Sequence, residues 1–139
     1  MTKTLTDYRT LVLGTLGDPT GRRYSNNMVD LALDQALAEW GRYLPGTWTI
    51  SGLNSATTTT IDDEDSMTLT KGAAAFAMEI RARSVTEVFG KRPEDTERLI
   101  EQADRLKAQF ETELAELSLE KTFSEDPWPR KGWAVRNLS

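Results

Sequence analysis

Four segments of this chain carry apolar residues at intervals of three and four positions, and each segment is bounded by glycine, proline or a capping residue. Such spacing places the apolar side chains on one face of an α-helix, so it predicts helices over residues 6–16, 25–44, 68–89 and 93–121. A chain of 139 residues is long enough to bury a single core. The candidate core residues are Leu11, Leu33, Trp40, Phe76, Ile80, Leu106 and Phe110.

Capping and breaking residues set the predicted ends of these helices. Thr6 is the expected N-cap of the first helix and Ser25 that of the second, which Pro45-Gly46 ends. The glycines between residues 14 and 21 could also form a phosphate-binding loop, but no Gly-Lys-Ser/Thr follows them and no strand is predicted before them. We therefore interpret these glycines as a helix end and a turn.

Residues 47–66 have a different pattern, which is rich in Ser, Thr, Gly and Asn and contains the β-branched run TTTTI. This composition predicts a small β-hairpin or an extended arm between the second and third helices. The short loop before residue 93 predicts that the last two helices form an antiparallel hairpin. The expected fold is thus mainly α: a four-helix domain over residues 1–121, with the arm at about 47–66, and an extended C-terminal tail over residues 122–139.

Cysteine and histidine are absent from the sequence. Their absence removes thiolate and imidazole metal ligands and the histidine base of Ser-His or Cys-His catalysis, so we expect no enzyme activity and no cofactor. The acidic run over residues 62–65 could hold Ca²⁺ or Mg²⁺, and a carboxylate-bound metal enzyme stays an alternative. The run lacks the alternating ligands of an EF-hand loop. We prefer a solvated turn whose charges favour the start of the next helix, and expect no metal.

Charge is distributed unevenly along the chain. The net charge is −5, but residues 127–139 hold three bases and no acid, so the first 126 residues carry −8. A body this acidic is a poor ligand for duplex DNA, which proteins bind through Lys and Arg that neutralise phosphates. No stretch approaches the ~20 apolar residues that span a bilayer, and the N-terminal ten residues lack an apolar signal region. We therefore expect a cytoplasmic protein without membrane contact.

The C-terminal residues PWPRKGWAVRNLS hold two of the four tryptophans together with the three bases. Prolines keep such a segment extended, and Trp and Arg are enriched at the energetic centres of protein interfaces. We prefer docking on a partner protein over folding back onto the chain's own domain, and both stay open. The candidate docking residues are Trp128, Arg130, Lys131, Trp133 and Arg136.

The order of elements in residues 5–45 resembles that of head-tail connector (adaptor) proteins of tailed bacteriophages. The motif residues are Leu16-Gly17-Asp18, a glycine-containing loop, Tyr24-Ser25, Ala36, Trp40 and Leu44-Pro45. The hairpin of two long helices and the extended C-terminal segment are also similar to that family. Such proteins are small and mainly helical, and they form a ring, commonly of twelve copies, beneath the portal at the exit of the head.

This resemblance implies a structural virion protein of the neck that is assembled in the host cytoplasm. The ring would join the portal to a stopper or tail completion protein, and viral DNA would pass through its channel without specific binding. The tail residues would dock on the portal, and acids of the fourth helix, with Glu101, Asp104 and Glu111 as candidates, would face the channel. An ordinary solvated face is the competing interpretation of these acids. A small helical DNA-packaging or regulatory subunit that binds nucleic acid is the alternative function.

Overall fold

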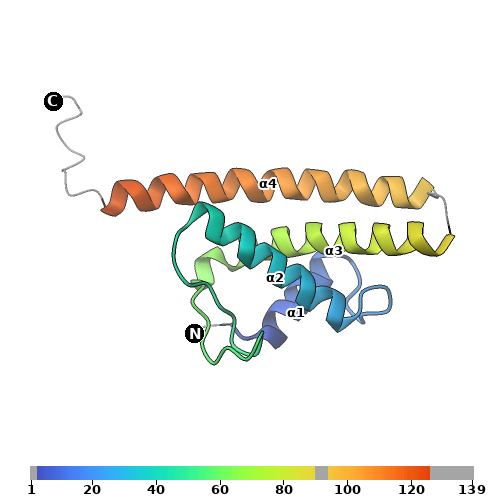
Figure 1. The fold of residues 1–139 in the computed structure, drawn as a ribbon, viewed down its shortest axis with the longest axis horizontal. Coiled ribbons are helices and arrows are strands. Elements are labelled where there is room, and N and C mark those ends of the chain that lie inside the picture. The colour runs from blue at the N-terminus through green and yellow to red at the C-terminus, as the bar shows by residue number, and fades with distance from the viewer. Residues whose placement is uncertain (1–2, 90–93, 126–139) are drawn as a thin grey trace.

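Two layers of helices make up the domain in the computed structural model, which describes residues 3–89 and 94–125. Its elements are α1 (Leu5–Thr15), α2 (Asn26–Tyr43), the 3-10 turn η1 (Asp63–Asp65), α3 (Ser66–Phe89) and α4 (Glu94–Glu125). Figure 1 shows α3 and α4 lying antiparallel, with α1 on the opposite side of α3 from α4 and α2 running obliquely across α3 so that its C-terminal end reaches α4. Helix α3 is the centre of the fold, because it packs against α1, α2 and α4 far more extensively than these three helices pack against one another. The prediction of a mainly α, four-helix domain is confirmed.

Helix ends follow the local capping chemistry. Ser25 caps α2 as predicted, because its hydroxyl accepts a hydrogen bond from the Met28 N–H at 3.2 Å. The first helix begins at a different cap: Thr4 donates its N–H to the Asp7 carboxylate at 2.9 Å. Thr6, the predicted cap, has no acid three residues later to complete a capping box. At the other end of the domain α4 extends to Glu125, so residues 122–125, which were assigned to the tail, are helical.

The turn between α1 and α2 is built around one buried carboxylate. Asp18 accepts hydrogen bonds from the backbone N–H groups of Arg22, Arg23 and Tyr24 at 3.1, 2.8 and 3.0 Å. Gly21 supplies the left-handed backbone that this turn needs, with φ at +70°. Burial alone would raise the pKa of Asp18, but the three donors and the charge of Arg23 outweigh it and lower that pKa below its ordinary value.

The core lies between α3 and the other helices. Leu33, Trp40 and Phe110 are fully buried, whereas the other predicted core residues are only half-buried. Three of these half-buried residues pack against the core at its edge: Leu11, Phe76 and Ile80. The fourth, Leu106, is half-buried as well, and it is not among the described residues that pack against the core cluster. Helix α2 meets α4 at Phe110, whose ring centroid is 6.4 Å from that of Trp40.

The segment before η1 is neither a β-hairpin nor a projecting arm. Residues 47–62 contain no strand, and they fold onto the domain with Ile50 and Ile61 buried in the core. The backbone N–H of Thr60 donates to the carbonyl of Thr49 at 2.9 Å, but the reciprocal bond from the Thr49 N–H goes to the Thr60 hydroxyl at 2.8 Å. At this residue pair, a threonine hydroxyl thus takes the place of one of the two backbone hydrogen bonds that a strand pair would form.

Candidate functional site

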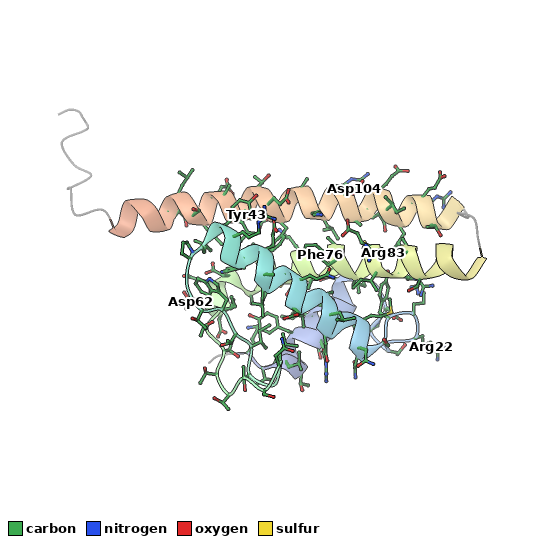
Figure 2. The ribbon with its side chains drawn as sticks, in the orientation of Figure 1. Arg22, Tyr43, Asp62, Phe76, Arg83 and Asp104 are labelled. Carbon is green, nitrogen blue, oxygen red and sulfur yellow. The ribbon has the colours of Figure 1, made fainter. Side chains whose placement is uncertain are left out.

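A surface pocket of about 370 Å³ lies at the end of the domain where α4 approaches its C-terminus. Its walls come from the end of α2, the loop that follows, the turn η1 and α4. The apolar lining residues are Trp40, Leu44, Trp48 and Leu117. The polar lining residues are the four acids Asp62, Glu64, Asp65 and Glu120. Figure 2 shows Asp62 at this end of the molecule. No base lines the pocket among the residues that the structure describes, so we name it the acidic pocket.

Two tryptophans form the aromatic wall of the acidic pocket. The ring centroids of Trp40 and Trp48 are 6.2 Å apart, with the planes inclined by 68°, which is an edge-to-face arrangement. The Trp40 side chain is buried in the core, while the Trp48 side chain is half-buried. The indole N–H of Trp48 donates to the Leu44 carbonyl at 2.5 Å, and the backbone of Gly46 lies against the same ring. These contacts hold the Trp48 ring in its place in the lining of the pocket.

Three of the acids stand together at the start of α3. One carboxylate oxygen each from Asp62, Glu64 and Asp65 lies within 4.8 Å of the others. They are the one group in the described part of the chain with a spacing suited to a divalent cation, and exposed acidic clusters of this kind are common without an ion. Their position at the N-terminal end of α3 matches the predicted role of this run as a favourable charge at a helix start.

Two acids of η1, Asp63 and Asp65, also affect a tyrosine of the core. Burial, with the charges of Asp63 and Asp65 adding to it, raises the pKa of the Tyr8 hydroxyl to about 12. A pocket that combines four carboxylates with indole rings favours cations, because carboxylates pair with ammonium and guanidinium groups and the face of a tryptophan attracts both. The acidic pocket therefore suits a Lys or Arg side chain from a partner segment.

A second pocket, of about 380 Å³, shares Trp48 with the first and has different chemistry. Asp34 is its one charged lining residue, and the carboxylate of Asp34 already accepts a hydrogen bond from the Asn54 amide at 2.8 Å. This pocket lacks a group of charges that could select a ligand.

The acids of α4 divide between a surface face and the helix hairpin. Glu101 and Asp104 are exposed and Glu111 is half-buried. Figure 2 shows Asp104 on the side of α4 that faces away from α3. Glu113 points instead toward α3, where it binds the Lys71 ammonium at 2.7 Å and accepts from the Thr68 hydroxyl at 2.8 Å. Partial burial would raise the pKa of Glu113, but these two partners lower it below its ordinary value.

The predicted docking residues of the tail, Trp128, Arg130, Lys131, Trp133 and Arg136, lie outside the described residues.

The acidic pocket itself was not predicted from the sequence. The acidic run at residues 62–65 is visible in the sequence, but nothing local connects it with Trp48 or with Glu120, which is 55 positions after Asp65. Only the folded hairpin brings Glu120 to the start of α3.

None of the helices in the described part of the chain is both long and apolar enough to cross a membrane. Comparison of the chain with protein-family models, with curated proteins and with solved structures finds no match.

Proposed function

We propose that this chain is a structural virion protein, a head-tail connector subunit that forms a ring under the portal and joins the capsid vertex to the tail or stopper. The proposal starts from the resemblance of residues 5–45 to connector proteins. The structural observation that carries it is the outward face of α4, which is exposed and mainly acidic along its described side chains. The reaction is assembly, and no covalent chemistry is proposed.

The length and charge of α4 suit the wall of a DNA channel. The helix has 32 residues, which corresponds to a length of about 48 Å. Between residues 96 and 120 its exposed charged residues are the acids Glu97, Glu101, Asp104, Glu116 and Glu120 and the bases Arg98 and Arg105. A surface with this excess of acids repels phosphates, so a genome would slide past it without binding. Glu111 would contribute at the edge of this face, because it is half-buried.

The helical domain and the tail would have separate roles in the assembly. The domain would make the head-to-tail contacts that close the ring, in which twelve copies are expected from the family resemblance. The tail would dock on the portal through Trp128 and Trp133, with Arg130, Lys131 and Arg136 as its charges. Because every contact is repeated around a ring, modest affinities of single subunits add up through avidity.

A pull-down with the portal protein as bait tests this proposal. The full chain and a chain that ends after Asp126 are compared at equal concentration, with circular dichroism to verify that both are folded. We expect the full chain to be retained and the shortened chain to be lost, because the docking residues are removed. Retention of neither chain would contradict the connector function, and equal retention would contradict the role of the tail.

The alternative function, a small subunit that binds nucleic acid, makes the opposite prediction for duplex DNA. Its binding would depend on the cationic tail and would weaken as salt rises, because Lys and Arg release counterions from DNA. A connector subunit with an acidic face should show no such binding. An electrophoretic mobility assay at low salt, with the full and the shortened chain, distinguishes the two functions.

A further inference from the structure

The acidic pocket and the C-terminal tail have complementary chemistry within one chain. The tail, residues 127–139, has three bases and no acid, while the described lining of the pocket has four acids and no base. We propose that the acidic pocket is the docking site of the chain's own tail, with Arg130 and Lys131 bound among its carboxylates in the free subunit. This inference goes beyond the connector function and does not require a portal.

The chain geometry allows the tail to reach the pocket. Glu120 lines the pocket and α4 ends at Glu125, five residues later, which corresponds to a rise of about 7.5 Å along the helix. The five residues from Asp126 to Arg130 span up to about 17 Å when extended. Arg130 can therefore return to the level of Glu120 without any unfolding of α4. Pro127 and Pro129 favour the extended backbone that such a return needs.

Attachment to the same chain favours this occupant over others. A short tether gives a docked segment an effective concentration in the millimolar range, well above the concentration of a second copy in dilute solution. A lining that combines four carboxylates with the half-buried Trp48 suits a guanidinium, which pairs with carboxylates and also stacks on indole rings. The second pocket, with Asp34 as its one charged lining residue, offers no comparable match to the tail.

The proposed contact would also affect any partner that uses the tail. A tail bound in its own pocket is not available to another protein, so the apparent affinity for that partner is reduced by the fraction of subunits with a released tail. The acidic pocket would thus hold the tail until a partner with a stronger site replaces it.

The experiment observes the four tryptophan indole N–H signals of the full chain by two-dimensional ¹H–¹⁵N NMR. The wild-type chain is compared with a tail variant (R130Q/K131Q/R136Q), a pocket variant (E64Q/E120Q) and a control variant (E101Q/D104N). The control removes the same charge as the pocket variant from an exposed part of α4. The Trp48 signal is assigned by its loss in W48F.

We expect the Trp48 signal to move in the tail variant and in the pocket variant, and to stay in place in the control. About 0.5 M NaCl should move the wild-type signal in the same direction, because salt screens surface charge pairs. The shifts should not change on tenfold dilution. An unchanged Trp48 signal in the tail variant would overturn the proposal, and so would a shift that disappears on dilution, because the occupant would then be the tail of a second copy. This test uses the protein alone, so its failure leaves the portal pull-down unaffected.

Discussion

Gly72 of α3 lies directly against the ring of Phe110 on α4: a Cβ atom at position 72 would stand 2.5 Å from Cε2 of that ring. Phe110 is fully buried, and its ring centroid is 6.4 Å from that of Trp40, so the ring is held from its other side as well. The missing side chain at Gly72 therefore sets how closely the two helices of the hairpin approach.

Replacing Gly72 with alanine should destabilise the domain. The substitution gains about 0.5–1 kcal/mol in helix propensity, but overpacking a buried aromatic ring costs about 1–3 kcal/mol. We expect Gly72→Ala to lower the free energy of unfolding by about 0.5–2 kcal/mol, measured by urea denaturation. Gly14 is the matched control, since it lies in α1 with no atom within 4 Å of its Cβ position. A gain in stability for Gly72→Ala like that expected for Gly14→Ala would contradict the packing argument.

Acid should destabilise the domain through two carboxylates. Asp18 and Glu113 have pKa values below their ordinary values of 3.8 and 4.5, so the folded state binds fewer protons than the unfolded state. Their contribution to stability is present above the ordinary values and is lost as the pH falls through the lowered ones. We expect the urea midpoint to fall steeply below about pH 4.

Two variants separate these contributions. Asp18→Asn should flatten the acid dependence, because an amide cannot gain the proton that the carboxylate takes up. Lys71→Met should raise the pKa of Glu113, because the ammonium at 2.7 Å is removed. A ¹³C-detected titration of the Glu113 carboxyl measures this change directly. An unchanged Glu113 titration in Lys71→Met would show that the ion pair contributes nothing in solution.

The buried hydroxyl of Tyr8 should give a transition at high pH. Its pKa is raised from 10.0 to about 12, so the folded state holds the proton more tightly than the unfolded state. The resulting stability is complete below pH 10 and is lost as the pH rises toward 12. Burial also raises the pKa of Tyr24, so absorbance at the tyrosinate band should show late titration from both residues, and Tyr8→Phe should remove the step near pH 12. No described atom accepts a hydrogen bond from this hydroxyl, so Tyr8→Phe should keep or increase stability at neutral pH.

Local chemistry made most of the helices predictable. Ser25 is a strong N-cap with an apolar stripe behind it, and Pro45-Gly46 ends that stripe, so the boundaries of α2 follow from neighbouring residues. The run of threonines before Ile61 predicts a strand, because β-branched residues favour strands, whereas in the structure the hydroxyls of Thr59 and Thr60 accept hydrogen bonds from the backbone of a loop. The contact of Gly72 with Phe110 and the meeting of Glu120 with η1 depend on tertiary packing, which no local pattern contains.

The proposed channel face can be tested by charge reversal. Glu101 and Asp104 are exposed, so Glu101→Lys with Asp104→Lys should change the free energy of unfolding by no more than about 0.5 kcal/mol per site. The variant should bind duplex DNA measurably at low salt, with an affinity that falls as salt rises. Fluorescence anisotropy of labelled duplex checks this, and the neutral pair E101Q/D104N should bind much more weakly. Equal DNA binding by wild type and the lysine variant would contradict a repelling role for this face.

The central claim, that the chain is a connector subunit, is tested most directly by electron microscopy of the portal protein mixed with an excess of the full chain. We expect class averages with an additional ring on one end of the portal, centred on its channel and with one subunit at each repeated site. A portal that looks the same with and without the chain, at concentrations well above those used in the pull-down, would contradict it.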